Sequence, residues 1–123
     1  MTVDAPDRPA PRHGVGVFDS GVGGLSVLRA LRLRRPTLPL VYVADSGHAP
    51  YGERADAFVI DRAMRVTEHL LDRGAELIVV ACNTATAVAI DALRARWPGT
   101  RFVGVEPGLK PALAASRSGR IVV

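Results

Sequence analysis

The chain has 123 residues, 48% of them hydrophobic, which is enough to bury one core and predicts one domain. Its single cysteine excludes an intramolecular disulfide framework, and no Cys/His cluster has the spacing of a metal site. The longest apolar stretches are too short to cross a bilayer, and the polar, proline-rich start lacks the apolar segment of a signal peptide. We therefore expect a soluble, cytoplasmic protein with no membrane partner.

The net charge of +4 raises the question of a nucleic-acid partner. Fifteen of the sixteen basic residues are arginines, spread over the chain. The densest run, RALRLRR (29–35), falls at the end of a predicted helix, where the helix dipole favours cations. Neither an RNA-binding platform nor a recognition-helix motif is visible, so we expect no nucleic-acid partner.

Residues 1–13 contain three prolines and no periodicity, which predicts a disordered leader. The run GVGVFDS (14–20) predicts a strand, and GVGG (21–24) predicts a turn. Apolar residues at helical spacing then predict a helix over 25–35, which a proline ends. LPLVYVAD (38–45) is predicted to be a second strand.

SGHAPYGE (46–53) has the glycine and proline content of a loop. A long amphipathic pattern predicts a helix over 55–73, with Gly74 as its C-terminal cap. The uninterrupted apolar run AELIVVAC (75–82) is typical of a strand buried on both faces, and a helix is predicted over 84–97.

The last predicted elements are a strand over 100–105, a turn over 106–108, a helix over 109–117 and the start of a strand over 119–123. This alternation predicts an α/β fold over 14–123, with an open parallel sheet and helices on both faces. Such sheets bind ligands at the carboxyl ends of their strands. The predicted strand ends carry several polar side chains: Asp19, Ser20, Asp45, Cys82, Asn83, Thr84 and Glu106.

The segment DSGVGG, which begins at Asp19, follows a strand and precedes a helix, the place where backbone N–H groups can hold a phosphate. It lacks the third glycine of G-x-G-x-x-G, because Ser26 stands there, and the lysine of a Walker A loop. Two interpretations stay open: Asp19 or Ser20 caps the helix, or it contacts a ligand.

In the loop HAPYG, His48 is expected to be solvated, whereas Tyr51 and Gly52 offer a hydroxyl and a backbone N–H to a small anionic ligand. Cys82 is sharper. A free cysteine is usually a small core residue, but here a strand meets a helix N-terminus, which stabilises a thiolate. With Asp19 on a neighbouring strand, the thiol would suit proton transfer or nucleophilic attack on a small substrate.

Four segments carry a resemblance: VFDSGVGGLSVL, YVADSGHAPYGER, VVACNTATA and VGVEPGLKPAL. In order and separation they resemble the N-terminal half of the glutamate racemase family, within the aspartate/glutamate racemase superfamily. The resemblance covers about residues 14 to 120 and implies that 14–123 form the N-terminal α/β domain of a two-domain architecture, the second domain being absent.

The resemblance implies a cofactor-independent, metal-free interconversion of L- and D-glutamate that supplies D-glutamate for peptidoglycan. One cysteine thiolate removes the α-proton, and a second, protonated cysteine delivers a proton to the opposite face. Cys82 matches the first of these, with Asp19 as its proton partner. The positions that match the family's substrate-binding residues are Asp19, Ser20, Tyr51, Gly52, Asn83 and Thr84.

The second family cysteine belongs to a Cys-Thr-His motif of the second domain, and this chain has one cysteine. Three hypotheses follow: a glutamate racemase fragment that is impaired alone, a homodimer that brings two copies of Cys82 face to face, and a non-catalytic module that binds an acidic amino acid or a phosphate. Aspartate racemase is a further alternative, but the DSGxGG and PYG motifs favour glutamate over aspartate racemase.

Overall fold

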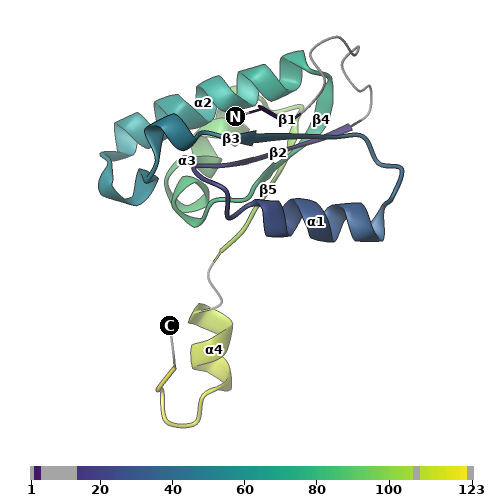
Figure 1. The fold of residues 1–123 in the computed structure, drawn as a ribbon. Helices are drawn as coiled ribbons and strands as arrows, with labels where there is room; N and C mark the ends of the chain where they lie inside the picture. The colour runs from purple at the N-terminus through teal and green to yellow at the C-terminus, as the bar shows by residue number, and fades with distance from the viewer. Residues whose placement is uncertain (1, 4–13, 107–108, 122–123) are drawn as a thin grey trace.

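The structure is a computed structural model that describes residues 2–3, 14–106 and 109–121. Over these residues the chain forms a five-stranded sheet in the order β1-β3-β2-β4-β5 (Figure 1). The last four strands in the chain are parallel, which confirms the predicted open parallel sheet. The strands are β1 (Thr2–Val3), β2 (Gly14–Asp19), β3 (Leu40–Ala44), β4 (Ala75–Val80) and β5 (Arg101–Gly104).

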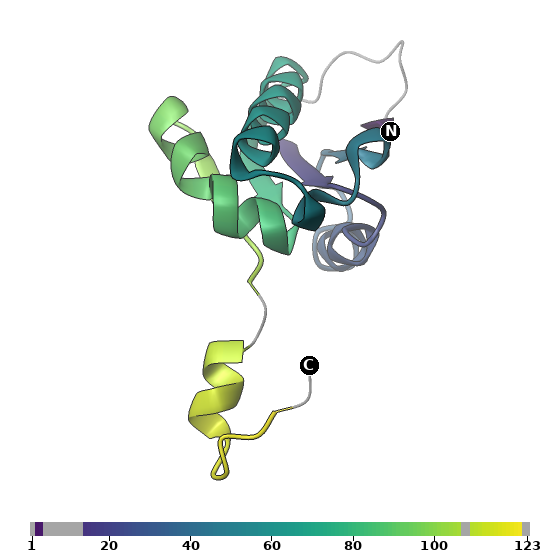
Figure 2. The ribbon, with the colours of Figure 1, turned by 90° about the vertical axis from the view of Figure 1, so that its left-hand side faces the viewer.

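The helices lie on both faces of the sheet, as predicted (Figures 1 and 2). Helix α1 (Leu25–Arg34) covers one face, whereas α2 (Asp56–Asp72) and α3 (Asn83–Arg96) pack together on the other. Helix α4 (Leu109–Ala115) lies apart from the sheet in both views. The connections β2-α1-β3 and β4-α3-β5 therefore run on opposite faces.

Two apolar clusters hold these layers together, because neighbouring residues of a strand point to opposite faces. Phe18 of β2 faces α2 and α3, where Val59, Leu70 and Leu93 are fully buried. Val17, one residue earlier, faces α1 with the four-residue cluster Val17, Tyr42, Ala44 and Val79. The sheet is thus buried mainly beneath α2 and α3, and its α1 face is the thinner layer.

Two terminal predictions need correction. Thr2 and Val3, expected in a disordered leader, form β1 and pair antiparallel with Val43 and Tyr42. This pairing gives partners to backbone N–H and C=O groups at the outer edge of β3. Residues 4–13 lie outside the described residues. The strand predicted over 119–123 is not formed in residues 119–121, because this segment follows α4 away from the sheet and meets no partner strand. Residues 107–108 and 122–123 are also not described.

Local signals explain where the other elements end. Gly74 has φ 88°, the left-handed conformation of a helix C-terminal cap, as its position predicted. The loop after β3 folds into two short turns, η1 (Ser46–His48) and η2 (Tyr51–Glu53).

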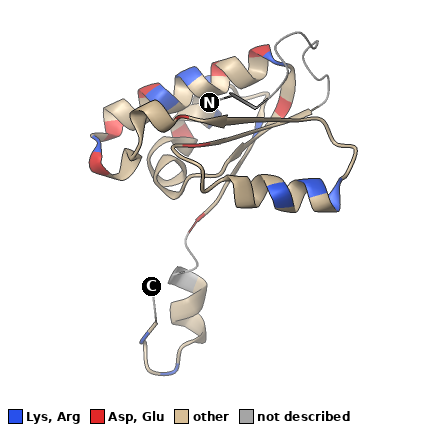
Figure 3. Cartoon of the chain, viewed as in Figure 1, with Lys and Arg blue, Asp and Glu red and all other residues tan. Residues whose placement is uncertain are grey.

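The arginines of α1 gather towards its C-terminal end (Figure 3), and Arg32 donates to the carbonyl oxygens of Pro36 and Leu38 at 2.8 Å each. This contact favours the helix-end explanation of the basic run.

Candidate active site

The strand order reverses between β2 and β4, so the carboxyl ends of these adjacent strands form the topological switch point of the sheet. Asp19 ends β2 and Ser20 follows it, while Cys82 lies two residues beyond β4. The first and third predicted strands are therefore neighbours, as the pairing of Asp19 with Cys82 requires.

Cys82 is the N-cap residue of α3 and is 7% exposed. Its Sγ accepts the backbone N–H of Ala85 at 3.4 Å and donates to the Ser20 hydroxyl at 3.7 Å. The sulfur therefore faces the positive end of the helix dipole and at the same time has a proton acceptor beside it. The thiol thus has polar partners in addition to its packing contacts in the core.

Asp19 is 8% exposed and binds the turn between β2 and α1. Its Oδ1 accepts the backbone N–H of Ser20 at 2.7 Å, and its Oδ2 accepts that of Gly24 at 2.6 Å. The N-cap residue of α1 is Gly24, so neither Asp19 nor Ser20 caps the helix itself, and Asp19 binds the turn that precedes it. The Ser20 hydroxyl also lies 3.4 Å from Oδ1, which places it between the Cys82 thiol and the Asp19 carboxylate. A ligand contact by Asp19 stays a prediction.

Asp45, at the end of β3, binds Tyr51 and Arg62. The Tyr51 hydroxyl donates to Asp45 Oδ2 at 2.5 Å, while Arg62 donates from Nε and Nη2 to the two carboxylate oxygens at 2.9 Å each. Burial opposes the charge of Asp45, but these hydrogen bonds and the Arg62 charge outweigh it and lower its pKa to about 2. Burial, followed by the bond to Asp45, raises the pKa of Tyr51 far above its usual range.

The loop and the first turn of α3 meet beside the thiol. A Cβ at Gly52 would lie 3.7 Å from Thr84 Oγ1, in ordinary contact, so the backbone of Gly52 faces α3. Gly52 and Asn83 are exposed, whereas the Tyr51 side chain is buried and its hydroxyl is already donated to Asp45. A ligand here would therefore meet the loop backbone and not the phenol that we had expected. Glu106, beyond β5, is exposed.

His48 is partly solvated, with 42% of its side chain exposed, and in addition its Nδ1 lies 3.1 Å from Asp45 Oδ1 and its ring lies beside that of Phe58. Arg62 was missed, since nothing in the sequence distinguishes it from the other arginines. It reaches Asp45 from the second turn of α2, seventeen positions along the chain.

Thr86 was missed too, although a threonine four residues after Cys82 on one helix carries a signal, because its hydroxyl can reach back to that carbonyl. Thr86 Oγ1 lies 2.8 Å from the Cys82 carbonyl oxygen and 3.2 Å from that of Val80, so the two carbonyls share its one O–H donor, and it accepts the Val105 N–H at 3.2 Å. Gly104 leaves room for it, since a Cβ there would collide with the Thr86 methyl group. The hydroxyl thus joins the ends of β4 and β5 to the turn that carries the thiol.

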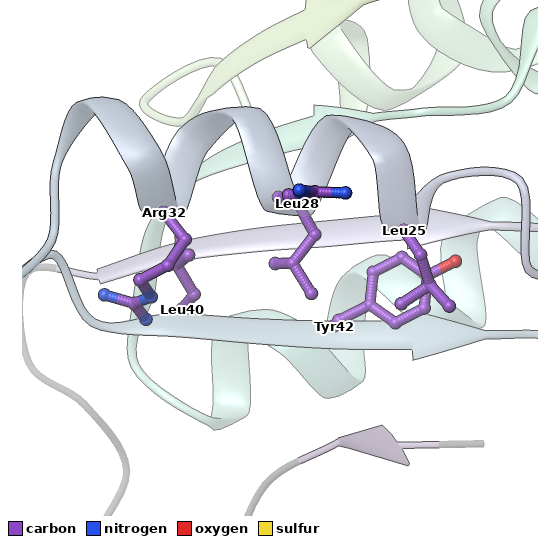
Figure 4. Close-up of a pocket in the computed structure, with 6 residues that line it drawn as sticks. Leu25, Leu28, Arg32, Leu40 and Tyr42 are labelled. Carbon is purple, nitrogen blue, oxygen red and sulfur yellow. The ribbon is translucent and has the colours of Figure 1, made fainter.

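A cavity of about 330 Å³ lies elsewhere, between α1 and β3 (Figure 4), and none of the predicted site residues lines it. Its lining residues are Leu25, Leu28, Arg29, Arg32, Leu40 and Tyr42. Among the residues that the structure describes, no group of three or more His, Cys, Asp or Glu side chains could hold a metal ion. Nor does any helix of this part of the chain have the length and apolar character needed to cross a bilayer.

Fold and site together define an open α/β domain with a thiol, a hydroxyl and a carboxylate in contact at the switch point of its sheet. No family model matches the chain. It is 58% identical over 109 residues to the glutamate racemase of Ectopseudomonas mendocina, a match that covers 89% of this chain and 41% of that protein.

Solved structures agree with this likeness. The chain superposes on glutamate racemase from Escherichia coli, solved with L-glutamate and the activator UDP-MurNAc-Ala, with a TM-score of 0.78 and 42% identity over 88% of this chain and 41% of that one. With glutamate racemase from Francisella tularensis, solved with D-glutamate, the TM-score is 0.72 and the sequence identity is 27%. That match covers 84% of this chain and 38% of the other. The resemblance to glutamate racemases is confirmed, and the chain spans about two fifths of their length.

Proposed function

We propose that this chain supplies one face of a glutamate racemase site, in which Cys82 exchanges the α-proton of glutamate without a cofactor. The observation that carries the proposal is the contact chain from the Cys82 thiol through the Ser20 hydroxyl to the Asp19 carboxylate, with the Ala85 N–H directed at the sulfur. Two related proteins, solved with L-glutamate and D-glutamate, support the choice of substrate.

The proposed reaction begins with the Cys82 thiolate removing the α-proton and becoming a thiol, while the electron pair of the C–H bond stays on the α-carbon. In this proposal the substrate is held by the hydroxyls of Ser20 and Thr84, the amide of Asn83 and the backbone of Tyr51 and Gly52. The Asp19 carboxylate would pair with the ammonium group and accept the proton that the thiol gives up.

Inversion needs an acid on the opposite face of the α-carbon, and Cys82 is the only cysteine of the chain. We assign that acid to a second α/β domain, which the family likeness implies, with residues 14–123 as the first. A second copy of this chain is the alternative source. In the cytoplasm the product would serve peptidoglycan synthesis.

The test is proton NMR of L- and D-glutamate incubated with the purified chain in D₂O, with optical rotation followed in parallel. We expect loss of the α-proton signal with the wild type and none with Cys82→Ser. The double variant Cys82→Ser, Ser118→Cys is the matched control, because it keeps one thiol but moves it to an exposed position. Exchange that continues in Cys82→Ser would overturn the proposal.

The same experiment separates the alternatives. Inversion by the wild type would mean that a second copy provides the second acid, and a strictly monomeric mass in solution would exclude that source. Exchange without inversion would identify a one-sided site. Glutamate binding without exchange, detected as line broadening of its signals, would favour the binding module. Absence of both binding and exchange would overturn the proposal.

A further inference from the structure

The Asp45 carboxylate is fully engaged inside the protein. It is 8% exposed, and its two oxygens accept two bonds from Arg62, one from the Tyr51 hydroxyl and a contact from His48. A buried carboxylate is stable only when charge and hydrogen bonds compensate it, and the planar guanidinium provides both. Asp45 therefore has little capacity left for a substrate, although it lies at the same strand edge as Asp19.

The bonds to Asp45 join three separate segments. Asp45 follows β3, Tyr51 belongs to η2, and Arg62 projects from α2, whose neighbouring residues Val59 and Ala63 are completely buried. The side-chain hydrogen bonds that the structure shows from the intervening loop, those of His48 and Tyr51, both go to Asp45. The loop is thus tied to the packed body of the domain through one carboxylate and the arginine that holds it.

The anchored loop also meets the first turn of α3, the helix whose N-cap residue is Cys82. Tyr51 is 1% exposed and fixes the loop to the core. The next residue, Gly52, is exposed, and a Cβ built on it would lie within contact distance of Thr84 in the first turn of α3. A shift of the Tyr51 ring would move Gly52 with it, because the two residues are consecutive.

We propose that Arg62 is a positioning residue for substrate binding: through Asp45 it holds Tyr51, and so sets the distance of the Gly52 backbone from Thr84 and Cys82. The inference rests on the proposed function, since glutamate is the ligand that this loop would meet. Arginine is required because its fork donates to both oxygens of one carboxylate, whereas a lysine offers a single point charge.

The experiment compares Arg62→Met and Arg62→Lys with Arg65→Met as the matched control. Arg65 lies on the same helix, and its ion pair with Asp61 is exposed, with 67% and 58% of the two side chains accessible. The first readout is amide hydrogen exchange of residues 46–54 without any ligand. We expect it to become about tenfold faster in Arg62→Met and intermediate in Arg62→Lys, because the loop loses charge-assisted bonds, with β2 and β4 unchanged.

The second readout is the affinity for glutamate, which we expect to fall about tenfold in Arg62→Met, while alkylation of the single thiol by iodoacetamide changes less than twofold. Unchanged exchange in residues 46–54, or faster exchange with unchanged glutamate affinity, would overturn the inference. If Arg62→Met does not fold, Tyr51→Phe removes one bond of the same network and the same comparison applies.

The two proposals fail in different ways. A wild-type chain that binds no glutamate contradicts the proposed function, and with it the substrate part of this inference, whatever the loop does. A wild-type chain that binds glutamate, together with an Arg62→Met chain that binds it equally well, contradicts only the positioning role. Exchange in the loop, measured without ligand, decides the anchoring by itself.

Discussion

The tripeptide Asp-Ser-Gly occurs twice, at residues 19–21 and 45–47, each time at the carboxyl end of a parallel strand. The two copies are neighbours, because the Asp45 N–H donates to the Asp19 carbonyl at 2.9 Å, and both carboxylates are 8% exposed. Their bonding nevertheless differs. Asp19 accepts backbone N–H groups of the following turn, whereas Asp45 accepts side chains of Tyr51 and Arg62.

The residues after each tripeptide cause this difference. GVGG folds back within four residues and brings the Gly24 N–H to Asp19, while HAPYG carries a tyrosine back to Asp45. Asp45 is therefore neutralised by Arg62, but Asp19 has no ion pair with any residue that the structure describes. One carboxylate is thus held in an ion pair, whereas the other meets backbone N–H groups and the Ser20 hydroxyl.

The largest expected effect comes from Asp19→Asn. This change keeps the shape of the side chain but removes its charge and its ability to take a proton. We expect the rate of α-proton exchange of glutamate to fall at least about a hundredfold, the usual contribution of a positioned acid–base partner. The free energy of unfolding should fall by only about 1 kcal/mol, because one oxygen can still accept from the turn.

The measurement pairs the NMR exchange assay with urea unfolding, and Asp72→Asn, at the exposed end of α2, is the control. Loss of stability without loss of exchange would mean that Asp19 only stabilises the turn between β2 and α1. In that case the two tripeptides would differ in geometry but not in role.

Asp45→Asn should reduce stability more than Asp19→Asn does and should affect the thiol less. Removing the charge leaves Arg62, whose side chain is 20% exposed, without its partner, so we expect the free energy of unfolding to fall by about 2 kcal/mol at pH 7. The Cys82 thiol should still react with iodoacetamide at close to the wild-type rate in the folded variant. A stability within 0.5 kcal/mol of the wild type, roughly the scatter of neutral surface changes, would contradict the anchor.

The pH dependence of stability sharpens the same contrast. The folded pKa of Asp45 is lowered to about 2, below the value of roughly 3.9 expected in the unfolded chain. Its stabilising contribution is therefore complete above about pH 5 and is lost as the pH falls from there towards 2. Urea unfolding at pH 7, 5, 4 and 3 should show a decline that is shallower in Asp45→Asn than in the wild type.

Much of this fold could be predicted because the spacing of apolar residues and the positions of helix-ending residues are local features of the sequence. The apolar run of β4, the amphipathic α2 and Gly74 each mark an element without reference to the rest of the chain. The antiparallel pairing of Thr2–Val3 could not be predicted, since a two-residue strand has no periodicity and depends on the free edge of β3. The strand expected after α4 failed for a related reason, because strand formation requires a neighbour.

The site divides in the same way. The strand-end rule predicted that Asp19, Ser20 and Cys82 would share one edge, and their contacts follow from the order of β2 and β4. Arg62 could not be identified, because its partner is distant in the chain and its register on α2 depends on how the helix packs. The inward orientation of the Tyr51 phenol has the same cause, since only the folded structure shows that Asp45 is its acceptor.

Thr86→Val tests the third strand end, that of β4, where no carboxylate is present and a threonine hydroxyl makes the connection. The variant keeps the shape but loses the one O–H that the Cys82 and Val80 carbonyls share, and it leaves the Val105 N–H without its side-chain acceptor. We expect the free energy of unfolding to fall by about 1.5 kcal/mol, with Thr86→Ser restoring most of it. Equal stability of the Val and Ser variants would show that the hydroxyl contributes nothing.

The smallest effect is expected where the two tripeptides are most alike, at their glycines. A Cβ at Gly21 or Gly47 would meet nothing within 4 Å, and neither residue has a left-handed φ. Alanine at either position should therefore change the free energy of unfolding by less than about 0.5 kcal/mol in urea titrations. A clear loss at Gly21 alone would mean that close backbone approach matters at the thiol edge but not at the anchor. The contrast between the two copies would then begin at the third residue of the tripeptide and not after it.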